Sequence, residues 1–154
     1  MLKKWKNKKL LKNEKGLTLV ELLAVIVILA IIAAIAVPAI GNIINKSKDR
    51  AILAEASNIL AGAKIAYIDG ACDNNGTCGA TALQPFVDGV DLTGTSVTFA
   101  SNKWTITYPN LDKMKTNLKT ESTTITEADL NAKLKSAGVE PEPAGGKGGE
   151  EEKD

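Results

Sequence analysis

The sequence predicts an α+β chain in which a long N-terminal hydrophobic helix continues into an amphipathic half that packs on a small antiparallel β-sheet. Three observations lead to this fold class. Residues 22–44 carry no charge, residues 43–68 are amphipathic at helical spacing, and residues 95–108 form two alternating segments with a short turn between them. An apolar helical face is stable in water only when another element covers it, and a small sheet is the simplest cover.

Residues 1–16 form a basic leader that we expect to be removed rather than to join the fold. The leader carries seven lysines and one glutamate, whereas residues 17–154 have a net charge of −5. A basic end beside an apolar run marks the cytoplasmic side of a membrane segment. Binding of nucleic acid by the lysines is the alternative, but no aromatic platform or second basic stripe accompanies them.

The apolar run is long enough to cross a membrane. About 20 residues, at roughly 1.5 Å each, span a bilayer core, and we assign residues 17–44 to a transmembrane helix. Glu21 is the exception, because a carboxylate beside a spanning segment costs about 3 kcal/mol unless it has a partner. On these grounds two interpretations of Glu21 stay open, an interfacial carboxylate that reaches water or a functional group.

The junction between leader and helix is a specific motif. Residues 16–21 (GLTLVE), with lysines before them and an apolar run containing Pro38 after them, resemble the class III signal of type IV pilins and pseudopilins. The resemblance covers roughly residues 1–55. It implies cleavage between Gly16 and Leu17 by a prepilin peptidase, followed by N-methylation of Leu17. The commonest first mature residue in the family is Phe, so Leu17 departs from the usual pattern.

The resemblance also implies that Glu21 and Pro38 act in assembly. In the family, the carboxylate at the position of Glu21 is needed for methylation and assembly and neutralises an N-terminal ammonium in the filament. A buried carboxylate and a buried ammonium are each costly alone and tolerable as a pair. Family members carry a proline at the position of Pro38, where the helix can unwind in filaments. From the residues alone, Pro38 either kinks the helix or ends it.

Residues 45–138 are predicted to form an exported α+β domain that begins with the second half of the long helix. The charged side chains of this half, Asp49 among them, are expected mostly off its apolar face. Asp69 and Gly70 end the helix. The apolar face comprises Ile52, Ala56, Ile59, Ala63 and Ala66, and is widened by Leu53, Leu60 and Tyr67.

Cys72 and Cys78 enclose five residues rich in turn formers. Two cysteines so placed in an exported chain predict one small disulfide loop, and the spacing and ligand number do not fit a CxxC redox or zinc site. Asp73, Asn74 and Asn75 also suggest a calcium site, but the distal glutamate of an EF-hand loop is missing. We therefore expect neither a metal nor a cofactor.

Residues 95–100 and 103–108 are predicted to be the strands of a hairpin with Ser101 and Asn102 in its tight turn. The hairpin is expected to cover the apolar face of the helix. Trp104 and Tyr108 are assigned to core packing, and sugar binding by these two rings is the alternative.

The remaining segments carry weaker patterns. Residues 81–92 are predicted to form one short helix or a loop, and residues 123–126 a third strand or an extended edge. A helix then begins with Thr126 as its N-cap and ends at Gly138. Residues 139–154 include six acids, two lysines and no bulky apolar residue after Val139, and are predicted to be a disordered acidic tail.

The chain contains no histidine, which removes Ser-His, Cys-His and His-zinc arrangements and argues against an enzyme. The resemblance implies a structural subunit of a type IV pilus-like filament. Such a subunit is inserted in the cytoplasmic membrane with its N-terminus inside and is then polymerised through its hydrophobic helix into a filament at the cell surface. The implied partners are copies of the same chain, the prepilin peptidase and methyltransferase, and the pilus assembly platform protein and motor. Nucleic acid would be contacted only through the assembled filament.

Other functions are weighed against this one. A pseudopilin of a competence (DNA-uptake) or type II secretion system would carry the same signal. A non-polymerising, single-pass anchored binding module would explain the apolar run and the exported domain, but not the junction at residues 16–21. An anchored enzyme would need a catalytic constellation, which the sequence does not offer.

Overall fold

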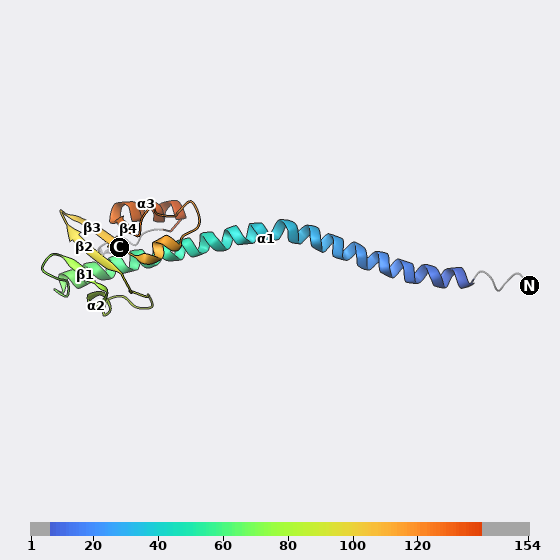
Figure 1. Ribbon diagram of the computed structural model, residues 1–154, viewed down its shortest axis with the longest axis horizontal. Helices are drawn as coiled ribbons and strands as arrows, with labels where there is room; N and C mark the ends of the chain where they lie inside the picture. The colour runs from blue at the N-terminus through green and yellow to red at the C-terminus, as the bar shows by residue number, and fades with distance from the viewer. Residues whose placement is uncertain (1–6, 140–154) are drawn as a thin grey trace, which may run out of the picture. The chain divides into compact units, whose positions relative to one another are not determined.

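The computed structural model describes the backbone of residues 7–139 and the side chains of residues 16–139. The chain divides into two units, residues 1–43 and 44–154. Helix α1 (Asn7–Ile68) is drawn in Figure 1, and it includes Pro38 in its interior. Pro38 therefore does not end the helix. Most of the predicted tail, residues 140–154, lies outside the described part of the chain.

The second unit contains a four-stranded antiparallel sheet in the order β1-β2-β3-β4, so that consecutive strands are neighbours (Figure 1). The strands are β1 (Thr77–Gly79), β2 (Ser96–Ala100), β3 (Lys103–Thr107) and β4 (Thr124–Thr126). The predicted hairpin corresponds to β2 and β3, and the weaker third segment to β4. Strand β1 was not predicted.

The hairpin forms because its turn residues and the alternating apolar residues of its strands favour the same structure. Ser101 and Asn102 have φ values of 51° and 60°, the paired left-handed conformation of a two-residue turn that suits the twist of antiparallel strands. Val97 lies opposite Ile106 across the two strands, and both side chains are fully buried. This buried pair faces the core, as a hairpin that covers the apolar face of the helix requires.

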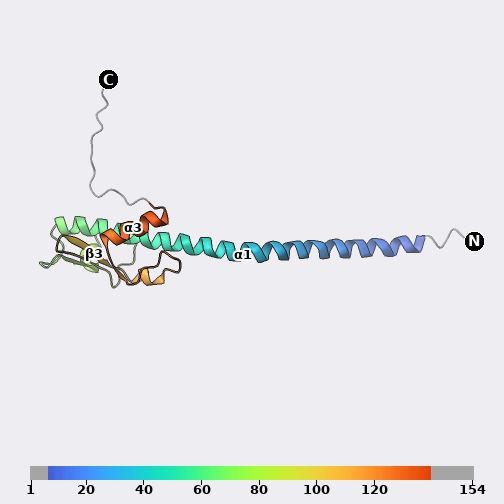
Figure 2. The same ribbon diagram turned by 90° about the horizontal axis from the view of Figure 1, so that it is seen from above.

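Up to residue 139 the second unit also contains three shorter helices, and α3 lies along the part of α1 that belongs to this unit (Figure 2). At the start of α3, the Thr126 side chain accepts a hydrogen bond from the backbone amide of Asp129. At its end, Gly138 adopts a left-handed conformation with φ of 72°. Both predicted caps are thus confirmed. The helices are α2 (Ala80–Leu83), η1 (Pro109–Lys113) and α3 (Glu127–Ala137).

The core of the second unit lies between α1, the sheet and α3. The fold is the predicted one, a long N-terminal helix packed on a small antiparallel sheet. The apolar face of α1 is buried as expected, except that Ile52 is half-buried and Tyr67 is 40% exposed. The buried residues of this face are Leu53, Ala56, Ile59, Leu60, Ala63 and Ala66.

Tyr108 anchors the end of the hairpin to α1. Its side chain is 1% exposed, and its hydroxyl donates to Glu55 Oε2 at 2.6 Å and accepts from Asn110 Nδ2 at 2.7 Å. Burial and the hydrogen bond to Glu55 raise the pKa of Tyr108 to about 12. Because the ring is enclosed, it offers no stacking surface for a sugar. Trp104 is half-buried and packs on Phe99, with ring centroids 4.7 Å apart, so both aromatic residues serve the packing of the domain.

Asp49 is the polar exception on the buried face of α1, where only 1% of it is exposed. Its carboxylate accepts hydrogen bonds from Lys115 N at 3.1 Å, Thr116 N at 2.7 Å and Thr116 Oγ1 at 2.6 Å. The expectation that Asp49 lies off the apolar face is wrong, because the loop after η1 supplies donors that only the tertiary structure brings together. Burial raises the pKa of Asp49, but the Thr116 and Lys115 hydrogen bonds outweigh burial and hold this pKa below its usual value.

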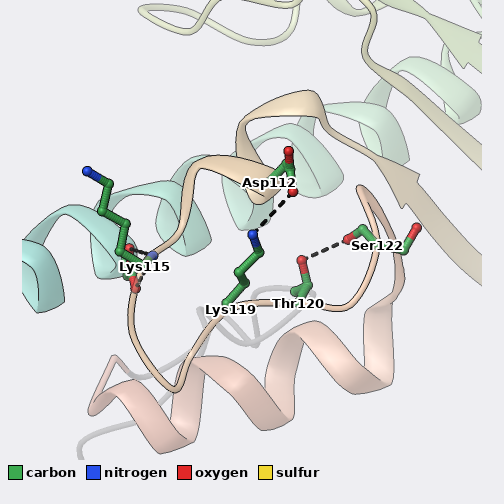
Figure 3. A network of polar contacts seen from close by, with 6 residues as sticks. Asp112, Lys115, Lys119, Thr120 and Ser122 are labelled. Atoms are coloured by element: carbon green, nitrogen blue, oxygen red, sulfur yellow. Dashed lines mark hydrogen bonds and ion pairs between the residues drawn. The ribbon is translucent and has the colours of Figure 1, made fainter.

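The loop that Asp49 holds is reinforced by its own contacts. Figure 3 shows Lys115 beside α1 and Lys119 pointing to Asp112. Lys119 Nζ and Asp112 Oδ1 are 3.3 Å apart, and the Thr120 hydroxyl donates to the Ser122 carbonyl at 2.7 Å. The loop is thus fixed at one end by Asp49 and along its length by these two contacts.

Replacing Asp49 with alanine is expected to lower the free energy of unfolding by about 3 kcal/mol at neutral pH, because two backbone amides lose a charged acceptor. Since the folded-state pKa of Asp49 is lowered, its contribution is present above the unfolded pKa of about 3.9 and is lost as the pH falls through the folded pKa. The deficit of the variant should therefore shrink below about pH 4. Thermal unfolding of the full-length chain in detergent at several pH values measures this.

Asp112→Ala is the matched control, since it removes an exposed carboxylate whose ion pair, within residues 16–139, is with Lys119, and it should barely move the unfolding midpoint. Equal effects of the two substitutions would show that the contacts of Asp49 do not stabilise the fold.

Candidate processing and assembly segment

The predicted processing residues Gly16, Leu17 and Glu21 all lie within α1, which begins upstream of them at Asn7. Leu17 and Glu21 are four residues apart, so their side chains share one face of the helix. Apart from its chain neighbours and the backbone of its own helix, a Cβ atom built at Gly16 would meet nothing within 4 Å. The predicted cleavage point therefore lies in an open, helical stretch of the described chain.

The helix that follows Gly16 is apolar and uncovered. Between residues 17 and 44 its large apolar side chains are each 47–71% exposed. From Gly16 onward, the most apolar stretch of α1 has none of its residues buried. By length and composition α1 can cross a membrane. So large an apolar surface is unfavourable in water, and lipid or other protein helices are the environments that would cover it.

Two further features of this segment bear on packing. Glu21 is the only charged residue between positions 16 and 45, and it is exposed. Ala30, Ala33 and Ala34 fall on one face of the helix by their spacing. Small residues let neighbouring helices approach closely where lipid offers no hydrophobic gain. The segment thus combines one carboxylate with a face suited to close helix contact.

The cysteine loop of the second unit is closed by a disulfide between Cys72 and Cys78. Within it, Asp73 Oδ1 accepts hydrogen bonds from Asn75 N at 3.1 Å and Thr77 N at 2.6 Å. The carboxylate that suggested a calcium ligand therefore stabilises a turn. Among residues 16–139, no group of three or more His, Cys, Asp or Glu side chains gathers as a metal site would require.

A groove of about 680 Å³ lies between the loop of residues 117–122, β4 and α3. Thr and Ser make up six of its fourteen lining residues, and its charged lining residues are Lys119, Glu121, Asp129 and Lys133. Lys133 Nζ donates to the Lys119 carbonyl at 3.0 Å, which ties α3 to the loop. None of the residues predicted for processing, assembly or the disulfide lines this groove.

Comparison with protein families supports the predicted signal at the junction between the leader and the apolar helix. Residues 11–37 match the prokaryotic N-terminal methylation motif. The match begins in the lysine-rich leader, includes Gly16, Leu17 and Glu21, and ends one residue before Pro38. No curated protein and no solved structure matches the chain. The chain carries the prokaryotic N-terminal methylation motif, the prepilin-like class III signal typical of type IV pilins and pseudopilins.

Proposed function

We propose that this chain is a structural subunit of a type IV pilus-like filament, made as a precursor that is cut after Gly16 and methylated at Leu17. The observation that carries the proposal is the methylation motif on a helix whose large apolar side chains are exposed throughout residues 17–44. A membrane anchor alone needs the apolar helix but not the motif. A filament subunit needs both.

Cleavage changes the chemistry of the helix end. The carbonyl of Gly16 is hydrogen-bonded inside α1, so the peptidase has to open the helix locally, and a glycine makes this easier by about 1 kcal/mol relative to alanine. Cleavage then leaves the Leu17 ammonium at a new helix N-terminus, where four backbone amides lack helical partners. Glu21 lies one turn away on the same face, and its negative charge is favoured at this end of a helix dipole.

Assembly moves residues 17–44 from lipid into contact with the same helix of other subunits. This transfer involves little net change in hydrophobic burial, because lipid tails are as apolar as the helix itself. Close packing along Ala30, Ala33 and Ala34, repeated over many subunits, then stabilises the filament. The Leu17 ammonium and the Glu21 carboxylate pair in the buried core, which avoids the cost of leaving either charge alone. At Pro38 the helix lacks one backbone hydrogen bond, so its backbone can change conformation most easily there.

Residues 45–138 lie outside the cytoplasm in this proposal, and the basic leader stays inside until it is removed. The disulfide between Cys72 and Cys78 supports this placement, since such bonds persist in oxidising compartments. Pseudopilins of competence or type II secretion systems carry the same kind of signal, and the motif does not separate them from pilins.

Shearing of the cell surface followed by sedimentation tests the proposal. The mature-length chain is expected in the sheared, high-molecular-weight fraction. Full-length chain found only in the membrane fraction would contradict assembly and favour an anchored binding module instead.

A further inference from the structure

The disulfide loop contains the tripeptide Asn75-Gly76-Thr77, which is the acceptor pattern for N-linked glycosylation. We propose that Asn75 is a glycosylation site and carries an N-linked oligosaccharide in the mature chain. The inference rests on the proposed export of residues 45–138, because oligosaccharides of this kind are added to chains that leave the cytoplasm.

The geometry of the loop leaves the acceptor side chain open. Asn75 is exposed, and within residues 16–139 its carboxamide makes no hydrogen bond, whereas its backbone amide donates to Asp73 Oδ1 at 3.1 Å. Gly76 is buried, with φ of 76°, and its carbonyl accepts from Phe99 N at 2.9 Å. The loop is thus fastened to β2 directly after Asn75, while Asn75 itself stays accessible.

A second tripeptide of the same pattern provides an internal contrast. Asn45-Lys46-Ser47 lies inside α1, and Asn45 is half-buried. It follows directly on the apolar segment, where the membrane surface would be, and its backbone is committed to helical hydrogen bonds. We expect Asn45 to remain unmodified.

The reaction is a group transfer without oxidation or reduction. The donor is an oligosaccharide linked through its anomeric carbon to a polyprenyl diphosphate, and an oligosaccharyltransferase of the cell supplies it. A bond forms between Asn75 Nδ2 and the anomeric carbon, the bond from that carbon to the diphosphate oxygen breaks, and Nδ2 loses one proton. The lipid diphosphate leaves with the electron pair.

The position of Thr77 indicates when the transfer takes place. In the folded domain, Thr77 Oγ1 lies 3.3 Å from Thr98 Oγ1, and Thr77 is paired with Thr98 across β1 and β2. The hydroxyl that completes the acceptor pattern is therefore engaged once the sheet has formed. Transfer is expected on the exported chain before β1 pairs with β2.

An oligosaccharide at this place would protect the sheet. Strand β1 is an edge of the sheet, and an edge strand with unpaired backbone groups is a template for pairing with another chain. Asn75 stands two residues before β1 begins at Thr77. A bulky, hydrated group there would hinder the approach of a second chain along the edge.

The test is mass spectrometry of the tryptic peptide of residues 65–103, taken from the chain as it is made in its native cells. This peptide holds the whole disulfide loop, and the neighbouring peptide of residues 17–46 holds Asn45. We expect carbohydrate mass on Asn75 and none on Asn45. Asn75→Gln and Thr77→Ala should abolish the modification, Thr77→Ser should retain it, and Asn45→Gln should leave it unchanged.

A peptide at its unmodified mass, or with only the mass change of deamidation, would overturn the proposal. The same peptide separates this failure from a failure of export. An intact Cys72–Cys78 disulfide without carbohydrate would refute glycosylation alone. Two free thiols without carbohydrate would count against both glycosylation and export.

Discussion

Replacing Glu21 with alanine is expected to lower incorporation into filaments by about a hundredfold and to leave membrane insertion intact. Removing one partner of a buried charge pair costs about 3 kcal/mol or more, which corresponds to about two powers of ten. The apolar residues 22–44 remain and still satisfy the length that a membrane span requires. Immunoblots of sheared and membrane fractions measure the two quantities separately.

Glu14→Ala is the matched control for this substitution. It also removes a carboxylate from the N-terminal region, but Glu14 belongs to the predicted leader and would be discarded. The control chain should assemble at the normal level. A normal filament yield from Glu21→Ala would contradict the pairing with the Leu17 ammonium and would make Glu21 an ordinary interfacial carboxylate.

Replacing Gly16 with arginine is expected to leave nearly all of the precursor uncut. This defect is expected at the peptidase and not within the chain, since a Cβ at Gly16 meets nothing within 4 Å beyond its chain neighbours and the backbone of its own helix. An uncut chain keeps its lysine-rich leader, and so many charges cannot be buried in a filament core. The measurement is the ratio of precursor to mature length on a gel.

Glu14→Arg introduces the same side chain two residues earlier and should be cut normally. Gly16→Ala adds only a methyl group and is too mild a change to decide the point. A mature-length product from Gly16→Arg would remove Gly16 from its proposed role as the residue before the cleaved bond.

Much of the fold could be predicted because its signals are local. The face of α1 repeats at three and four residues, the hairpin alternates on either side of Ser101 and Asn102, and α3 carries its own caps at Thr126 and Gly138. Each of these patterns is complete within a short stretch of chain. The local sequence preferences and the tertiary contacts therefore favour the same elements.

Other elements depend on partners that are distant in sequence. Strand β1 has only three residues and one strand neighbour, and its partner residues in β2 lie about 20 residues further along the chain, with Cys78 opposite Val97. The partners of Asp49 are 66 and 67 residues away. The sequence did contain one indication that Asp49 is buried. Asp49 precedes Leu53 by four residues and Ala56 by seven, so it falls on the apolar face of the helix.

The methylation motif is likewise a local pattern, and it could be predicted from residues 16–21 and the segments on either side of them. The partner proposed for Glu21 is not a feature that the sequence pattern contains. The Leu17 ammonium exists only after cleavage, and the buried environment of the pair exists only after assembly. Neither is present in a single uncut chain. The acceptor pattern at Asn75 was not predicted, because the same residues also fit a disulfide-closed turn and, less well, a calcium loop.

The N-terminal tryptic peptide of sheared surface material tests the proposed processing most directly. Trypsin cuts after Lys15 and Lys46, so an uncut precursor yields a peptide of residues 16–46, and the processed chain yields one of residues 17–46. We predict a peptide that starts at Leu17 and carries one added methyl group. A peptide that starts at Gly16 without a methyl group would contradict processing as a prepilin and, with it, the proposed assembly.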